Sequence, residues 1–160
     1  LHAIKKLNDS HVRLYIAGSG SELSNLMALS RQLDLGPQVT FSGFMTQAQL
    51  KNLYRRMDLA VLTSYSESFP LVLLEASDNL LPILSTDIGD IKVMIPNPEY
   101  GFIAKTGNVD SIVNELGEAV NKDPKELSAM ATREKKYVAD HFSVKKQLAS
   151  IEKVYKQVTK

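Results

Sequence analysis

Short apolar runs alternate with longer amphipathic stretches along this chain. Five runs rich in Val, Ile, Leu and Phe are predicted strands: residues 12–17, 39–41, 59–63, 82–85 and 101–104. The third contains "LAVL", which has no alternating polar positions, as expected of a strand covered on both faces. Strands separated by helical segments predict an α/β fold: an open parallel sheet of about five strands, helices on both faces and a helical tail.

Two helix starts carry recognisable capping residues. Ser19 and Glu22 fit a capping box for a helix that we expect to end near Gly36–Pro37. Thr46 and Gln49 fit a second box. The loops before these helices, "GSGS" and "SGF", then follow predicted strands at the sheet edge where open α/β folds bind ligands.

The C-terminal segment, residues 143–160, is predicted to be one amphipathic helix with Ser143 as its N-cap. Its apolar positions share helical spacing: Val144, Leu148, Ile151, Tyr155 and Val158. The half of the chain from Lys105 onward is mildly basic. We interpret this excess as a solvated face; weak peripheral contact with an anionic membrane, at the inner face of the cell membrane, is the alternative.

Composition narrows the class of protein. The 160 residues fit one domain, 44% are hydrophobic and 23% are charged, as in ordinary globular proteins. A net charge of +1 argues against a dedicated nucleic-acid binder. No apolar run has the length of a membrane-spanning helix. The absence of cysteine favours a reducing compartment, so a cytoplasmic protein is expected.

The stretch "ESFPLVLLE" places Glu67 and Glu75 at the ends of an apolar run. Charged side chains are rarely buried without a partner. Each acid could simply face solvent, on a helix or on the loop before it. The alternative is that both acids accept hydrogen bonds from a ligand.

A helix is expected to begin at Pro70, a favoured residue for the first helical position. Free N–H groups of Phe69, Leu71 and Val72 would then favour an anion such as phosphate. Hydroxyl-binding acids on both sides of an anion site match a sugar nucleotide, which has hydroxyls at both ends and a diphosphate between them.

The same residues carry a family resemblance. "ESFPLVLLE" resembles the E-x7-E motif of retaining glycosyltransferases of the GT-B fold, family 4 (group 1). "VTFSGF", "LYRRMDLAVLTS", "GFIA" and "HFS" are similar to further segments of that family, in order and spacing. The resemblance covers nearly the whole chain. It implies that residues 1–160 form a single donor-binding, Rossmann-like domain, the C-terminal half of a GT-B enzyme.

The resemblance also implies roles. Glu67 would be the catalytic residue, near the reacting carbon of the sugar, and Glu75 would bind the ribose hydroxyls. The implied substrate-binding residues are Gly18, Gly43, Phe44, Ser68, Phe69, Pro70, Leu71, Val72 and Glu75. A UDP- or GDP-linked sugar would be the substrate, with no cofactor and no metal, and a glycan or lipid-linked molecule the acceptor. The whole enzyme would be a hexosyltransferase of class EC 2.4, of the kind used in polysaccharide biosynthesis.

Several positions depart from the family pattern. Leu80 replaces a Gly at a helix end, so we expect Asn79 to adopt the left-handed conformation instead. Asp90 replaces a Gly in a loop that normally faces the ligand, and Lys92 and Val93 replace Pro-Glu. A carboxylate at position 90 could repel diphosphate or bind a sugar hydroxyl.

The family's N-terminal acceptor domain and the Arg and Lys that clamp the diphosphate are expected to precede "HAIKKL". The chain starts without Met, as a piece of a longer protein would. We therefore expect it to be inactive in isolation. A non-catalytic partner subunit is the second hypothesis. A doubly wound signalling domain is a third, but the chain has no convincing set of the acidic residues and late Lys that it requires.

Overall fold

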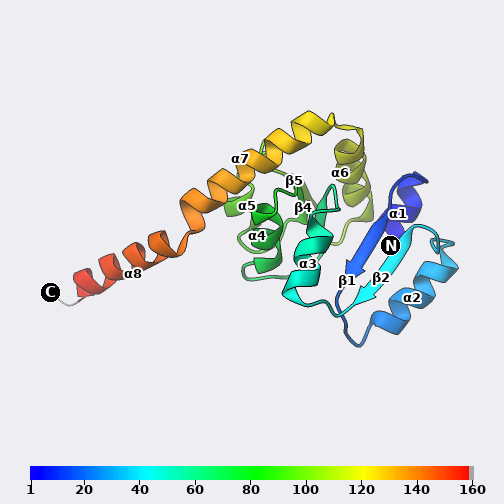
Figure 1. The fold of residues 1–160 in the computed structure, drawn as a ribbon, viewed down its shortest axis with the longest axis horizontal. Helices are drawn as coiled ribbons and strands as arrows, with labels where there is room; N and C mark the ends of the chain where they lie inside the picture. The colour runs from blue at the N-terminus through cyan, green and yellow to red at the C-terminus, as the bar shows by residue number, and fades with distance from the viewer. Residues whose placement is uncertain (159–160) are drawn as a thin grey trace.

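The structure is a computed structural model, and it describes residues 1–158 apart from the side chain of Lys145. The five strands are β1 (Leu14–Ala17), β2 (Val39–Gly43), β3 (Ala60–Leu62), β4 (Ile83–Thr86) and β5 (Phe102–Ala104). The helices are α1 (His2–Leu7), α2 (Leu23–Gln32), α3 (Gln47–Tyr54), α4 (Leu71–Asp78), α5 (Ile91–Met94), α6 (Val109–Asn121), α7 (Pro124–Phe142) and α8 (Val144–Val158). Strands and helices alternate up to α6 (Figure 1).

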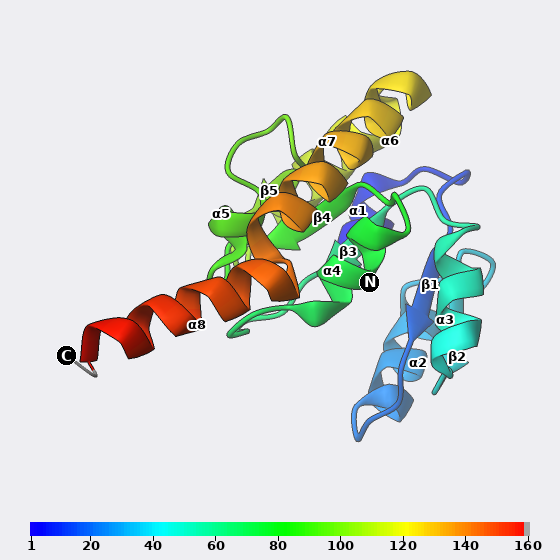
Figure 2. The same ribbon diagram turned by 60° about the vertical axis from the view of Figure 1, so that its left-hand side comes forward.

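All strand pairs are parallel, which confirms the predicted α/β architecture. β1 pairs with β2, while β3, β4 and β5 form a second ladder with β4 at its centre. The five expected strands are therefore present, but they are hydrogen-bonded in two groups. Figure 2 shows the pair β1–β2, with α2 and α3, beside the three-stranded group. Within residues 1–158 no strand bridges β1 and β3.

The central strand of the three-stranded group, β4, is buried on both faces. Ile83 and Leu84 are neighbours in β4, so their side chains point to opposite faces, and both are fully buried. Leu84 belongs to the core cluster that contains Ile4 and Leu116, whereas Ile83 packs with Leu73 and Met94. Continuous apolar strands of this kind are stable only between two layers of helices.

The start of α3 confirms one predicted capping box. The Gln49 N–H donates to Thr46 Oγ1, and the Thr46 N–H donates to Gln49 Oε1 at 2.8 Å. The box predicted at Ser19 is wrong, because α2 begins at Leu23. The Glu22 carboxylate accepts from the Asn25 side chain at 2.9 Å instead of reaching back along the chain.

Two helices are followed, directly after the C-cap, by a residue with positive φ and then by a buried leucine. After α2, Asp34 has φ 53° and lies two residues before the predicted end at Gly36, and Leu35 is 1% exposed. After α4, Leu80 has φ 58° and Leu81 is 3% exposed. The expectation for Asn79 is wrong, because its φ is −91°. Burial of the following leucine offsets the strain of the left-handed turn.

The predicted tail helix, residues 143–160, is present as α8, and residues 159–160 lie outside the described part. Ser143 is extended and separates α7 from α8, and its carbonyl accepts from the Gln147 N–H at 3.0 Å. α8 projects away from the body (Figures 1 and 2). Among the described residues no helix combines the length and apolar character needed to cross a membrane.

A buried acid lies between α4 and α7. Glu134 of α7 is fully buried, and neither carboxylate oxygen has a hydrogen-bond partner among the described residues. Burial raises the pKa of Glu134 to about 7, and the nearby Ser77 hydroxyl of α4 partly offsets this rise. In the folded protein Glu134 is therefore mainly the neutral carboxylic acid below about pH 7.

This raised pKa predicts a pH-dependent stability. The contribution of Glu134 to the free energy of unfolding should be fully present below the ordinary glutamate pKa of 4.5 and should be lost as the pH rises through about 7. The loss attributable to Glu134 is on the order of 2–3 kcal/mol. Urea unfolding at pH 5 and pH 8, compared between wild type and Glu134→Gln, measures it. Equal pH dependence in both proteins would contradict the prediction.

The loop after β4 packs tightly on the loop after β3. Gly89 has φ +46°, and a Cβ built at this position would lie 2.2 Å from the carbonyl oxygen of Glu67 and 3.1 Å from that of Ser68. Only glycine avoids this overlap with backbone atoms. The position of Gly89 therefore fixes how closely the β4–α5 loop approaches the segment 67–68.

Gly89→Ala should destabilise the protein by about 3 kcal/mol, because the backbone must move and the left-handed conformation is strained. Gly20→Ala is the matched control, since its Cβ would meet nothing within 4 Å. It should change stability by less than about 0.5 kcal/mol. Chemical denaturation of the two variants checks both values, and similar effects at the two positions would refute the packing argument.

Candidate functional site

Within each strand group, the loops at the carboxyl ends of neighbouring strands are hydrogen-bonded to one another. The Gly18 N–H donates to the Gly43 carbonyl at 2.8 Å, which joins the loops after β1 and β2. Thr86 Oγ1 at the end of β4 donates to the Ser64 carbonyl at 2.7 Å, which joins β4 to the loop after β3. Gly18 and Gly43 have positive φ values of 135° and 65°. Each contact joins two ligand loops within one strand group, at the carboxyl ends of its parallel strands.

The first turn of α4 presents backbone N–H groups at this edge. Pro70 is the N-cap, with extended backbone, and α4 begins at Leu71, so the predicted first helical position for Pro70 is off by one residue. The Leu73 N–H folds back to the Pro70 carbonyl at 3.0 Å. The N–H groups of Leu71 and Val72 precede any intrahelical acceptor, and both side chains are exposed. This helix start is suited to an anion.

Glu67 lies on the loop before α4 and is half-buried. Ser64 Oγ donates to Glu67 Oε1 at 3.0 Å. The same Ser64 is held through its carbonyl by Thr86, and Gly89 packs on the Glu67 carbonyl. Two neighbouring loops therefore fix the backbone of Glu67, while one carboxylate oxygen has no hydrogen bond among the described side chains.

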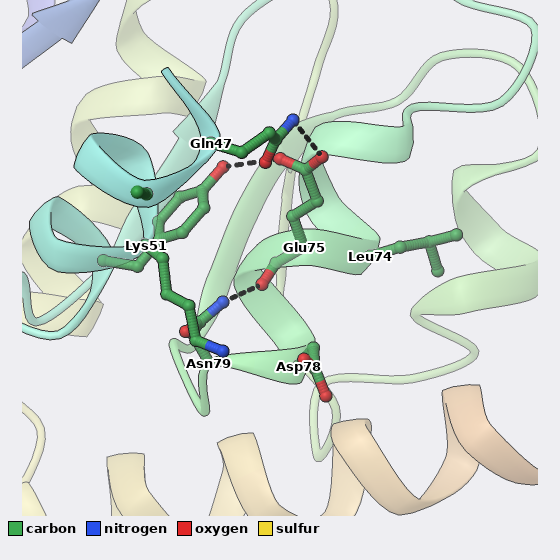
Figure 3. A pocket seen from close by; sticks show the side chains of 8 residues that line it. Gln47, Lys51, Leu74, Glu75, Asp78 and Asn79 are labelled. Atoms are coloured by element: carbon green, nitrogen blue, oxygen red, sulfur yellow. Dashed lines mark hydrogen bonds between the residues drawn. The ribbon is translucent and has the colours of Figure 1, made fainter. Parts of the chain in front are cut away.

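Glu75 lies in the second turn of α4 and faces α3 (Figure 3). Gln47 Nε2 donates to Glu75 Oε1 at 3.3 Å, and the Tyr54 hydroxyl donates to Glu75 Oε2 at 3.5 Å. Burial, and then the Glu75 carboxylate, raise the pKa of Tyr54 to about 12. The phenol is therefore a permanent donor near neutral pH.

An open hollow of about 430 Å³ lies between α3 and α4 beside this carboxylate. Its lining is mixed polar and apolar: Gln47, Ala48, Lys51, Tyr54, Leu74, Glu75, Asp78 and Asn79. Figure 3 shows Gln47 and Glu75 pointing toward one another at its rim and Leu74 pointing away. Of the predicted site residues, only Glu75 lines this hollow. Glu67 lies outside it, on the loop that leads into α4.

The other predicted residues are distributed along the carboxyl edge. Phe44, after β2, is 79% exposed, and Ser68 is exposed on the loop before α4. Pro70 is buried. The Phe69 ring stacks at a tilt on Phe142 of α7, with centroids 5.4 Å apart, so its side chain supports the loop and only its backbone is free for a ligand.

Three residues that contact the two acids were not predicted from the sequence. Ser64 binds Glu67, and Gln47 and Tyr54 bind Glu75. The spacing of Gln47, Lys51 and Tyr54 places them on one helical face, and this spacing is the sequence signal that could have indicated Gln47 and Tyr54. That α4 would pack on this face is a tertiary contact, and the local pattern does not encode it.

The described residues contain no group of three or more His, Cys, Asp or Glu side chains arranged to hold a metal ion. The acids at this edge are instead bound by neutral donors. The site therefore offers carboxylates that can accept hydrogen bonds from hydroxyl groups, beside free backbone N–H groups.

Comparisons with known proteins identify the family. The sequence profile of "Glycosyl transferases group 1" matches residues 1–137. D-inositol 3-phosphate glycosyltransferase of Mycolicibacterium smegmatis is 33% identical over 122 residues, which are 73% of this chain and 28% of that protein. N-acetyl-alpha-D-glucosaminyl L-malate synthase of Bacillus anthracis is 27% identical over 96% of this chain and 40% of its own length. The chain thus spans well under half of these relatives.

Solved structures share the fold. Anabaena HepE in complex with UDP superposes with a TM-score of 0.85 at 20% identity, covering 97% of this chain and 43% of HepE. The C-terminal domain of a glycosyl transferase group 1 family protein from Francisella tularensis gives a TM-score of 0.78 at 21% identity, covering 89% of this chain and 77% of that domain.

The profile match covers most of the chain, and the shared α/β fold agrees with it. The chain belongs to the glycosyl transferases group 1 family and has the GT-B type of fold.

Proposed function

We propose that this chain is the donor-binding domain of a retaining glycosyltransferase of family 4. The whole enzyme transfers a hexosyl group from a UDP- or GDP-sugar to a glycan or lipid-linked acceptor. The nucleotide sugar is a substrate, and no cofactor or metal is assigned. HepE, which shares the fold, has been solved with UDP and with UDP-glucose, and this favours a UDP-linked donor.

The observation that carries the proposal is the pair of acids at the start of α4. The N–H groups of Leu71 and Val72 are free to meet a diphosphate, while Glu75 lies one turn further on and Glu67 lies just before the helix. Cleavage of a glycosyl–phosphate bond builds positive charge on the sugar and negative charge on the diphosphate. A fixed carboxylate and fixed N–H dipoles stabilise these two ends of the transition state.

Each acid then has a distinct role. Glu75 makes only long contacts with neutral donors, so its carboxylate has lone pairs left to accept hydrogen bonds from the ribose hydroxyls. Glu67 accepts from the sugar hydroxyls near the reacting carbon and stabilises the developing positive charge. Gly18, Gly43 and Phe44 border the nucleoside across the edge.

We infer that transfer requires the remainder of the longer protein, because the chain covers 28–40% of the relatives described above. The 160-residue chain should bind donor weakly and should not transfer sugar. We propose a cytoplasmic location, with any membrane contact limited to the inner face of the cell membrane.

One observation favours a second function, that of a non-catalytic partner subunit. Asp90 is exposed at the start of α5, directly after Gly89, which packs on the Glu67 carbonyl. A carboxylate this close to the diphosphate region would weaken donor binding. The neighbouring Lys92 pairs with Asp87 at 2.6 Å and so does not neutralise Asp90.

The enzymatic proposal predicts different kinetic effects for the two acids in the longer protein that contains this chain. Glu67→Gln should lower kcat for donor hydrolysis by about 100-fold, because its charge acts in the transition state. Glu75→Gln should raise the donor KM by about 10-fold, because it removes charged hydrogen bonds to the ribose.

The control is Glu118→Gln, an exposed acid on α6 that pairs only loosely with Lys122 at 3.7 Å. It should leave both constants unchanged. Wild-type rates in both acid variants would refute the assigned roles, and absence of hydrolysis in the wild type would favour the non-catalytic subunit.

A further inference from the structure

The contacts between α3 and Glu75 come from opposite ends of one short helix. Gln47 is the first residue of α3 and Tyr54 is the last, and each donates to a different oxygen of the Glu75 carboxylate. Figure 3 shows the Glu75 side chain reaching toward α3 from α4. The carboxylate thus has one donor near each oxygen, and both donors belong to α3.

Both donors are themselves held in place. The capping box of Thr46 and Gln49 fixes the first turn of α3, where Gln47 lies. Tyr54 is 9% exposed and belongs to the core cluster that contains Leu73 and Ala76 of α4. Neither donor depends on a mobile surface loop for its position.

Tyr54 also links the carboxylate to the anion-binding end of the helix. Its hydroxyl lies 3.5 Å from the Val72 carbonyl as well as 3.5 Å from Glu75 Oε2. Val72 carries one of the free N–H groups at the start of α4. A single phenol therefore contacts the turn that meets the diphosphate and the acid that meets the ribose.

The contacts are long for hydrogen bonds to a carboxylate, and this fits an orienting role. At 3.3 and 3.5 Å they hold the carboxylate only weakly and leave acceptor capacity on both oxygens. Catalytic and binding contacts are often long before ligand binds and tighten in the complex. A carboxylate bound by strong cationic partners would have less capacity for two hydroxyls.

We propose that Gln47 and Tyr54 are positioning residues that orient Glu75 toward the ribose hydroxyls of the donor. This inference rests on the proposed function, because it assigns the Glu75 carboxylate to the ribose. It adds that selection of ribose over deoxyribose depends on α3 as well as on Glu75.

The experiment compares nucleotides that differ only in the 2′-hydroxyl. Calorimetry on the longer protein measures dissociation constants for UDP and 2′-deoxy-UDP, and for the GDP pair. Wild type should prefer the ribonucleotide by about 10-fold. Tyr54→Phe and Gln47→Met, which keep the ring and the side-chain volume, should each weaken ribonucleotide binding by about 3- to 10-fold and reduce the preference to about 2-fold.

Matched controls test whether the change is local. Tyr137→Phe alters a half-buried phenol of α7, and Gln32→Met alters an exposed amide at the end of α2. Both should keep the wild-type preference. A purely structural role for Tyr54 would weaken both nucleotides equally and leave their ratio unchanged, which would overturn the inference.

Glu75→Gln separates this inference from the proposed function. If wild type prefers ribonucleotide and Glu75→Gln abolishes the preference while Tyr54→Phe and Gln47→Met retain it, the positioning role is wrong and the proposed function stands. If wild type shows no preference and Glu75→Gln binds as tightly, the ribose assignment itself fails. Should Tyr54→Phe unfold, Gln47→Met decides, because its side chain is exposed.

Discussion

The free backbone N–H groups at the start of α4 are the constraint on which the candidate site depends. A helix begins with N–H groups that have no acceptor of their own, and at α4 these belong to Leu71 and Val72. Pro70 closes the preceding turn, and its carbonyl accepts the next N–H, that of Leu73. Any ligand that satisfies these groups is an acceptor, and an anion does so most favourably. The acids on either side would repel a bare anion, so the site suits a ligand whose negative charge lies between hydroxyl-bearing ends.

The rest of the edge holds that helix start in position. Gly89 lets the β4–α5 loop reach the Glu67 carbonyl, Thr86 ties Ser64 to β4, and the Ser64 hydroxyl binds Glu67. From α3, Tyr54 contacts both Val72 and Glu75. The two acids are therefore held by different elements. Glu67 is held by the loops of the three-stranded group, and Glu75 is contacted by side chains of α3. This division explains why Glu75 lines the α3–α4 hollow and Glu67 does not.

Local sequence signals predicted the strands, the parallel α/β class and the capping box at Thr46, because each depends on neighbouring residues. They failed where tertiary burial decided the outcome. The chain turns at Asp34 after α2 and at Leu80 after α4, since the next residues, Leu35 and Leu81, are buried in the core. The contacts of Gln47 and Tyr54 with Glu75 could likewise not be predicted from the local sequence pattern, because they require α3 and α4 to pack side by side. The motif singled out Glu67 and Glu75 as candidates, and the packing shows which side chains contact them.

Amide-resolved NMR titration of this chain with UDP, GDP and ADP tests the central claim most directly. The account predicts saturable shifts at millimolar nucleotide, centred on the amides of Gly43, Leu71, Val72 and Glu75. The shifts should be larger for UDP or GDP than for ADP. Unchanged amides at the start of α4, with shifts absent or confined to α8, would contradict it.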